Sequence, residues 1–393
     1  MAQDKKILTV QDISCVGQCS LTVAQPIISA CGVETCILPS AVLSNHTGAG
    51  FHGFTFRDLT EDIPEICSQW EKEGIRFDAV YTGYLGSVAQ IALVREIMDR
   101  LLLPGGLKIV DPAMADNGSL YQGFDQPFVQ KMAELCGKAD IILPNLTEAC
   151  FMTGMEYTSD VQTEDYVREL LSRLAALGAR KVILKGIFFR PDQLGNAVYD
   201  CASGELHYCF TERIPRSSHG TGDCFAAAFT GALMQGLDAC EATALAADFV
   251  VESILQTEDD PAHWYGVKFE KALPLLVRRL NRSAPKSAAA AAEERTRRRY
   301  VLHGGSFRDL EGFYREMDQL LTDGSVPTGH NLDALNDLLR GGFGRHAYGE
   351  PIELIWESFE ESRETLGAEQ LLRIVSIILN HEEEHDCVLK IEF

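Results

Sequence analysis

The stretch HGTGDCFAAAF (residues 219–229) places two glycines, a threonine and an acid directly before a run of small and apolar residues. This order predicts a loop that turns into the N-terminus of a helix. Glycines there let backbone N–H groups face one point, and the helix dipole adds positive charge, so Gly220, Thr221 and Gly222 form a candidate anion cradle. Asp223 at its rim could accept a proton from an attacking hydroxyl. The same turn also caps helices that bind nothing.

Length and composition limit the kinds of protein to consider. The chain has 393 residues and 46% hydrophobic content, enough for two globular domains. A net charge of −22 argues against nucleic acid as a ligand. The apolar runs are too short to span a membrane, and the polar start predicts no secretory signal. Twelve cysteines without CxxC pairs predict reduced, mostly buried thiols in a cytoplasmic protein.

A repeated pattern of apolar strand, polar cluster and helix runs through the first two thirds of the chain. Such alternation predicts an α/β fold with a mainly parallel sheet and helices on both faces. Strands are expected at 7–10, 34–38, 79–82, 107–110, 141–143 and 182–184, with a hairpin over 196–208. Helices are expected at 21–31, 58–73, 88–103, 226–234, 240–256 and 264–280. The polar residues that follow the strands should then meet at one sheet edge with Asp223: Asp12, Thr47, Tyr84, Asp111, Glu148 and Lys185.

Five motifs occur in the order and spacing of a known family: 44–47 (SNHT), 83–87 (GYLGS), 111–114 (DPAM), 144–148 (PNLTE) and 220–223 (GTGD). Residues 1–281 resemble the pyridoxal/pyridoxamine kinase branch of the ribokinase-like superfamily. The resemblance implies an αβα sandwich that transfers the γ-phosphoryl group of ATP to the 5′-hydroxyl of a vitamin B6 vitamer: pyridoxal, pyridoxamine or pyridoxine. It also implies a homodimer formed through this domain.

Residue roles follow from the same resemblance. Asp223 would be the catalytic base, and Gly220, Thr221 and Gly222 would bind ATP and stabilise the transferring phosphoryl group. The remaining ATP-binding residues would be Asp111, Asn145, Glu148 and Lys185. Asp111 and Glu148 would hold Mg²⁺, partly through water, and the family pattern also allows a monovalent cation. The vitamer would contact Asp12, His46, Thr47, Tyr84 and Asp223.

Two positions depart from the family pattern. Asp12 stands where many members carry a serine against the pyridine ring, and a carboxylate there suggests a preference for a cationic vitamer such as pyridoxamine. Ala115 replaces a common glycine on the phosphate side of the site. Taken alone, Asp111 and Glu148 could also be helix-capping acids, and His46 a structural histidine.

Residues 282–299 change in character, with a run of alanines followed by the sequence EERTRRR (293–299). Alanines favour helix, and the pairs Glu293–Arg297 and Glu294–Arg298 are spaced i,i+4 in the favourable order. We expect a semi-rigid helical linker that joins two domains.

Residues 300–393 form a second predicted domain, which has 19 acidic and seven basic residues. The segments 329–337 (GHNLDALND) and 354–360 (LIWESFE) resemble barstar, the inhibitor of the ribonuclease barnase. The resemblance implies a small α/β domain in which Asn331, Asp333 and Asp337 bind a basic ribonuclease. Thr328 and Asn336 replace family aromatics, so a solvated acidic helix kept for folding or assembly is the alternative.

Two other functions stay open for the whole chain. One is a kinase of the same fold acting on another hydroxymethyl substrate, such as a hydroxymethylpyrimidine or a sugar. The other is a ribonuclease inhibitor or scaffold protein whose kinase half is inactive.

Overall fold

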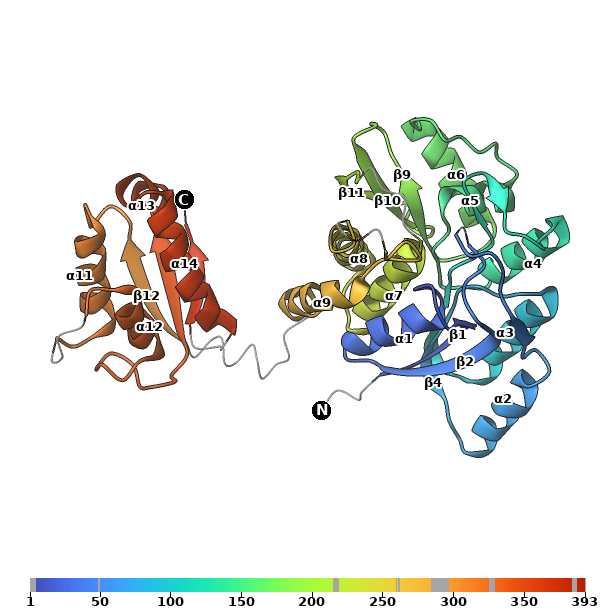
Figure 1. Ribbon diagram of the computed structural model, residues 1–393, viewed down its shortest axis with the longest axis horizontal. Coiled ribbons are helices and arrows are strands. Elements are labelled where there is room, and N and C mark those ends of the chain that lie inside the picture. Colours follow the sequence, from blue (N-terminus) through green and yellow to red (C-terminus); the bar gives the residue numbers. More distant parts are fainter. Residues whose placement is uncertain are drawn as a thin grey trace. The chain divides into compact units, whose positions relative to one another are not determined.

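The computed structural model describes residues 5–48, 50–214, 219–258, 260, 262–283, 297–324, 329–383 and 387–392. The chain divides into two compact units, Met1–Pro285 and Lys286–Phe393 (Figure 1). Within the described ranges, no helix is both long enough and apolar enough to cross a membrane. None of the twelve cysteines forms a disulfide, and six of them are buried, which is half of them where the sequence predicted most.

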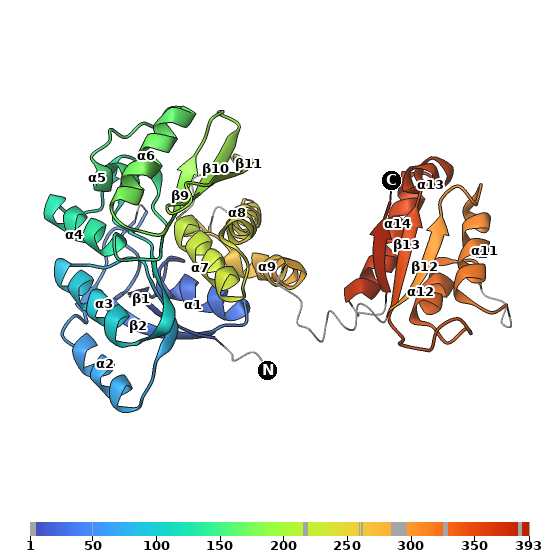
Figure 2. The same cartoon turned by 180° about the vertical axis from the view of Figure 1, so that it is seen from behind.

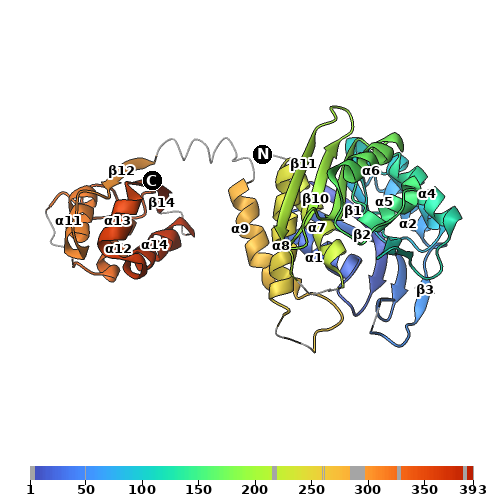
Figure 3. The same ribbon diagram turned by 90° about the horizontal axis from the view of Figure 1, so that it is seen from above.

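The first unit is built on a nine-stranded sheet with the order β11-β10-β9-β8-β5-β4-β1-β2-β3. The strands from β2 to β9 in this order pair in parallel, while β3, β10 and β11 join the edges in antiparallel fashion. Its strands are β1 (Lys6–Ser14), β2 (Glu34–Leu43), β3 (Phe56–Asp58), β4 (Phe77–Thr82), β5 (Leu102–Val110), β8 (Ile141–Ile142), β9 (Lys181–Ile187), β10 (Gln193–Asp200) and β11 (Leu206–Glu212). Figure 3 shows β10 and β11 as the expected hairpin.

Helices cover both faces of this sheet, so the predicted αβα architecture is confirmed (Figures 1 and 2). One face packs against α2 (Ile63–Lys72), α3 (Val88–Arg100), α4 (Gln126–Cys136), α5 (Leu146–Thr153) and α6 (Glu164–Ala176). The other packs against α1 (Leu21–Ala30), α7 (Thr221–Met234), α8 (Ala239–Leu255) and α9 (Phe269–Ser283). Alternate residues of β1 serve the two cores: Leu8 and Val10 face the first, and Ile7 faces the second.

The strand order reverses beside β1, which pairs with β2 on one side and with β4 on the other. Open α/β sheets bind ligands at such a reversal, beyond the carboxyl ends of the strands. A short extra hairpin, β6 (Ala115–Asp116) with β7 (Ser119–Leu120), follows β5 at this edge. The topology therefore brings the polar clusters of the sequence to one edge of the sheet.

Three predicted helix boundaries in this unit were wrong, in addition to the start of α7. Asp58 belongs to β3, where it pairs with Ala41, so α2 begins only at Ile63. The helix expected to reach residue 103 ends at Arg100, because Leu102 pairs with Phe77 in the sheet. The helix expected from residue 264 begins at Phe269. At the first two boundaries pairing in the sheet, which the helical period does not reveal, sets the limit of the helix.

The described residues of the second unit form a three-stranded parallel sheet in the order β12-β13-β14 with four helices, which confirms the predicted small α/β domain. Its buried cluster joins one face of the sheet, including Leu302, Leu354 and Trp356, to the helices. The elements are β12 (Arg298–His303), α11 (Leu310–Leu321), α12 (Leu332–Arg340), β13 (Ile352–Glu357), α13 (Phe359–Leu366), α14 (Ala368–Glu383) and β14 (Cys387–Ile391). Helix α13 was not predicted.

The predicted helical linker falls largely on residues 284–296, which lie outside the described residues. For the last two residues of this segment the helical prediction was wrong. Arg298 and Arg299 belong to β12, where they pair with Ile352 and Glu353 of β13. Leu302 is buried, whereas Arg299, Val301 and His303 lie on the other face. This alternation with a period of two is typical of a strand and not of a helix.

Candidate active site

The anion loop lies at the N-terminus of α7, five residues earlier than the helix predicted from residue 226. Gly220 caps the helix with φ of 80°, a left-handed conformation that favours glycine. A Cβ atom on Gly220 would also overlap the carbonyl oxygen of Gln18. In front of Gly222 there is open space, because a Cβ there would meet no described atom within 4 Å. The loop can therefore admit an anion to the helix N-terminus.

Asp223 occupies the first turn of α7 and has one described hydrogen-bond donor. The backbone N–H of Ser20 donates to Asp223 Oδ2 over 3.0 Å. Burial raises the pKa of Asp223 to about 7; the Ser20 hydrogen bond and Lys185 lower it, and the charges of Asp111 and Asp12 raise it. A carboxyl group that titrates near neutral pH is suited to general-base chemistry.

Lys185, at the end of β9, forms a buried ion pair with Asp111, which follows β5. Its Nζ donates to both Asp111 oxygens, at 2.9 and 2.8 Å, and only 12% of the lysine side chain is exposed. Burial lowers the pKa of Lys185, but Asp111 and Glu148 outweigh this and raise it, so the ammonium stays charged. Burial raises the pKa of Asp111 and Lys185 opposes that change.

Glu148 is both a helix cap and a member of the charged cluster. Asn145 and Glu148 form a capping box at the start of α5, with distances of 2.8 Å from Glu148 N to Asn145 Oδ1 and 2.7 Å from Asn145 N to Glu148 Oε2. Glu148 Oε1 also accepts a hydrogen bond from Met114 N. Burial and then Asp111 raise the pKa of Glu148 to about 8. The capping interpretation of Glu148 is therefore confirmed, and its role in binding metal or nucleotide stays a prediction. Asn145 Nδ2 donates a hydrogen bond of 2.8 Å to the carbonyl oxygen of Ala115.

The strands β1 and β4 bring Asp12 and Tyr84 to the same edge. Asp12 is 4% exposed and accepts a hydrogen bond of 2.8 Å from Ser14 Oγ. Burial raises the pKa of Asp12. The pKa of Tyr84 rises to about 12, first through burial and then through the charge of Asp12. The Tyr84 ring also lies 5.5 Å from that of Phe124, centroid to centroid.

His46 is held by the backbone on both sides of its ring. Gly48 N donates to Nδ1 at 2.8 Å, which leaves the proton on Nε2, 3.2 Å from the carbonyl of Tyr265. Burial lowers the pKa of His46, which agrees with a neutral ring. Its imidazole also packs edge-on against Phe51 at 4.9 Å. Thr47, beside it, is exposed. His46 can therefore shape a pocket wall, but both its ring nitrogens are engaged.

Sequence reasoning missed two residues at this edge. Ser20 supplies the N–H that binds Asp223, and its signal was its place directly before a helix, where serine is a common cap. Tyr121, after the β6–β7 hairpin, is the other. Burial and then the charges of Glu148, Asp116, Asp223 and Asp111 raise its pKa, although 39% of the residue is exposed. No local pattern in the sequence indicates Tyr121.

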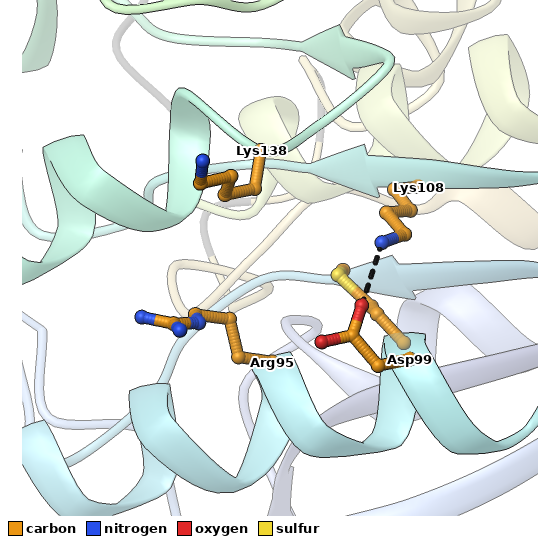
Figure 4. A pocket seen from close by; sticks show the side chains of 5 residues that line it. Arg95, Asp99, Lys108 and Lys138 are labelled. Carbon is orange, nitrogen blue, oxygen red and sulfur yellow. Dashed lines mark hydrogen bonds and ion pairs between the residues drawn. The ribbon is translucent and has the colours of Figure 1, made fainter.

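A separate cavity of about 120 Å³ lies elsewhere in the first unit and carries no part of this cluster. Its lining residues are Arg95, Met98, Asp99, Lys108 and Lys138 (Figure 4). Lys108 Nζ pairs with Asp99 Oδ1 at 2.9 Å, and two thirds of the Asp99 side chain is exposed. These charged side chains are solvated and lie around the C-terminal part of α3, where cations interact favourably with the helix dipole.

In the second unit, α12 carries the residues predicted to bind a ribonuclease. Asn331 caps the helix by accepting a hydrogen bond of 2.9 Å from Ala334 N, so its side-chain oxygen is engaged. Asp333 and Asp337 are both exposed, on the opposite side of the helix from buried Leu335 and Leu339. The predicted pair of carboxylates on one solvent-facing side is therefore present. Thr328 lies outside the described residues.

Family comparisons cover both units. A family model described as phosphomethylpyrimidine kinase matches residues 29–266, and one described as Barstar (barnase inhibitor) matches residues 298–391. Among curated proteins, the pyridoxine kinase of Bacillus subtilis is 30% identical over 189 residues. That match covers 47% of this chain and 66% of the relative, just under two thirds of its length.

Solved structures agree with the family match. A candidate phosphomethylpyrimidine kinase from Bacteroides thetaiotaomicron, crystallised with pyridoxal, is 37% identical with a TM-score of 0.66, covering 70% of this chain and 96% of that one. The pyridoxal kinase of Lactobacillus plantarum is 32% identical with a TM-score of 0.64, covering 70% and 97%. The chain therefore belongs to the phosphomethylpyrimidine kinase family, with pyridoxal kinases among its relatives, and carries a C-terminal Barstar domain.

Proposed function

We propose that the first unit transfers the γ-phosphoryl group of ATP to the 5′-hydroxyl of a vitamin B6 vitamer. The observation that carries this proposal is Asp223 at the mouth of the Gly220–Gly222 loop, with a pKa raised to about 7. A base with this pKa is partly ionised at neutral pH and can take a proton from an alcohol as it attacks phosphorus. The pyridoxal in the Bacteroides crystals supports a vitamer as the acceptor.

We infer a separate task for each charged residue. The open space at Gly222 admits the γ-phosphate to the N–H groups of the α7 N-terminus, which stabilise negative charge as it develops. Lys185 holds a positive charge beside them and keeps it because Asp111 and Glu148 face it. Asp223 Oδ2 is held by Ser20, so the other oxygen is available for the substrate hydroxyl.

The residues Asp111 and Glu148 suit Mg²⁺. Both are buried carboxylates at one edge, and Mg²⁺ is typically held by one or two carboxylates, with waters and phosphate oxygens as its other ligands. No group of three or more His, Cys, Asp or Glu side chains in the described ranges could hold a metal ion alone. This agrees with a site completed by nucleotide phosphates. Bound Mg²⁺ would neutralise phosphate charge.

The vitamer end of the site would be formed by Asp12, Tyr84 and the wall at His46, with Thr47 at the exposed rim. A buried carboxylate at Asp12 favours a cationic partner, because a positive charge would offset the cost of burying it. We expect native protein to prefer pyridoxamine over pyridoxal. The kcat/KM ratio for these two substrates should fall in Asp12→Ser, and an unchanged ratio would remove this assignment.

The decisive experiment is ADP release with ATP and Mg²⁺ in the presence of pyridoxal, pyridoxamine or hydroxymethylpyrimidine, comparing native protein with Asp223→Asn. Turnover of a vitamer that depends on Asp223 supports the proposal. Turnover of hydroxymethylpyrimidine alone would favour the second candidate function, which the phosphomethylpyrimidine kinase model itself suggests. If no acceptor stimulates ADP release, the kinase half is inactive. That result would favour the alternative that the chain is a ribonuclease inhibitor or a scaffold protein.

For the second unit, we propose that α12 binds a basic ribonuclease through its exposed carboxylates. The supporting observations are the Barstar match and the exposure of Asp333 and Asp337 on one side of the helix. Titration of the full chain against small basic microbial ribonucleases tests this, with Asp333→Asn/Asp337→Asn as the matched variant. Inhibition that is lost in the double variant supports recognition. No inhibition of any of these enzymes would leave a domain kept for folding or assembly.

A further inference from the structure

The turn that joins β1 to α1, residues 17–20, has an unusual backbone. Gln18 and Ser20 adopt φ values of 53° and 54°, in the left-handed region that residues with side chains rarely enter. In the described part of the chain only two other non-glycine residues do so, Asn117 and Ser358. Two such residues in one four-residue turn indicate that surrounding contacts impose its shape.

Three glycine contacts hold this turn in place. A Cβ on Gly220 would overlap the carbonyl oxygen of Gln18, and a Cβ on Gly266 would overlap the Gln18 side chain. Within the turn, a Cβ on Gly17 would overlap the ring of His46. The turn is therefore pressed between the anion loop, the segment before α9 and the loop after β2, and none of these can move without shifting it.

The turn places one backbone N–H group where it hydrogen-bonds to the carboxylate of Asp223. Ser20 N donates to Asp223 Oδ2, 203 residues away in sequence and 3.0 Å away in space. No other described residue donates to that carboxylate. The carbonyl of Cys19, which shares a peptide group with the Ser20 N–H, accepts a hydrogen bond of 2.8 Å from Thr22 Oγ1, so the start of α1 fixes this peptide from the other side. The direction of the Ser20 N–H is thus set by the fold.

We propose that Ser20 is a positioning residue, and that the 17–20 turn orients Asp223 for the proton transfer. An aspartate in the first turn of a helix can rotate to accept from its own helix N–H groups, which would turn both oxygens away from a substrate. Holding Oδ2 removes that freedom and presents the other oxygen to the acceptor hydroxyl. The inference rests on the proposed role of Asp223 as the proton acceptor.

The test displaces the turn without substituting any residue of the anion loop. Gly266 lies outside the left-handed region, so Gly266→Ala is compatible with its backbone, but the new methyl group must push Gln18 aside. Gln18→Gly removes the atoms that it would strike and suits the left-handed φ. We expect Gly266→Ala to lower kcat by about tenfold or more while the KM for ATP stays unchanged, and Gln18→Gly/Gly266→Ala to restore kcat.

A matched control is Gly106→Ala on β5, which also forces a contact, against Leu102, but lies away from the turn. It should leave kcat unchanged. Hydrogen exchange of the Ser20 amide gives a readout that needs no turnover: exchange should speed up in Gly266→Ala and slow again in the double variant. If Ser20 exchange and kcat both match native values in Gly266→Ala, the positioning role is wrong.

These measurements also separate the two claims. If native protein phosphorylates no acceptor, the kinase proposal fails, while the exchange data still decide whether the turn holds Asp223. If exchange changes as expected and kcat does not, the hydrogen bond exists but does not position the base, and the inference is overturned.

Discussion

The two units use the same building plan, a parallel sheet with helices, but they treat charge in opposite ways. The first gathers carboxylates and one lysine at the carboxyl edge of its sheet, where Asp111 and Glu148 are 3% and 2% exposed. The second places Asp333 and Asp337 on a helix face open to solvent. Buried charges have shifted pKa values and suit chemistry, whereas exposed charges suit long-range attraction of a partner.

The sharpest test of this contrast is one isosteric change in each unit. Asp223→Asn removes the proposed base but keeps the shape of the side chain, so we expect kcat for phosphoryl transfer to fall by about 10³-fold. Asp337→Asn makes the same chemical change on α12 and should leave kcat unaltered. Steady-state ADP release measures both. Equal effects of the two substitutions on kcat would contradict the proposed difference between the buried and the exposed carboxylates.

Breaking an ion pair should matter in proportion to its burial. Lys185→Met leaves Asp111 buried without its partner, and we expect it to cost about 3–5 kcal/mol in the free energy of unfolding of the first unit. Arg373→Met in α14 breaks an exposed pair with Glu369 and should cost less than about 1 kcal/mol. Urea unfolding followed by circular dichroism compares them. A small loss in Lys185→Met would mean that water reaches the pair.

The raised pKa of Asp223 predicts a dependence of stability on pH. A carboxyl whose pKa is higher in the folded state stabilises the fold when protonated, and this contribution is lost as pH rises from the unfolded value towards about 7. Asp223→Asn removes the penalty, so its stability relative to native protein should increase by roughly 1 kcal/mol or more from pH 4 to pH 8. Unfolding curves at several pH values measure it. A constant difference would show that Asp223 titrates normally.

In the second unit the same direction of pH dependence is expected at His330. Its ring nitrogens lie 2.5 Å from Glu311 Oε1 and 3.0 Å from Asp318 Oδ2, and hydrogen bonds to Asp318 and Glu311 raise its pKa. Protonated His330 then stabilises the unit below its ordinary pKa, and this is lost as pH rises through the folded value. We expect His330→Gln to lower the unfolding midpoint of this unit at pH 6 and to have little effect at pH 9.

The smallest effect should come from α12 itself. Asp333 lies in the first turn, where its charge favours the helix dipole, so Asp333→Asn should cost about 0.5 kcal/mol or less. Thermal unfolding of the full chain checks this. A much larger loss would mean that Asp333 supports the fold, and ribonuclease binding could then not be inferred from the same substitution.

The sequence was most informative where short apolar strands, each followed by a polar cluster, recur along the chain. Strand-then-polar-cluster repeats predicted the parallel sheet and the edge at which Asp12, Asp111 and Lys185 lie. It failed where tertiary pairing decides, as at Leu102, which joins β5 instead of extending α3, and at Arg298, which pairs with Ile352. The Ser20–Asp223 hydrogen bond could not be predicted, because it depends on a backbone direction set by three distant glycine contacts. The residue roles themselves stay predictions until activity is measured.

Among the twelve thiols, Cys15 stands apart. It follows β1 at the carboxyl edge of the sheet and is the only exposed cysteine, whereas burial raises the pKa of its neighbour Cys19 well above the ordinary range. A maleimide fluorophore should therefore attach to native protein at one predominant place, a few residues from the turn that holds Asp223. The molecule thus offers a natural labelling handle for following ligand arrival in real time by fluorescence, with no engineered cysteine.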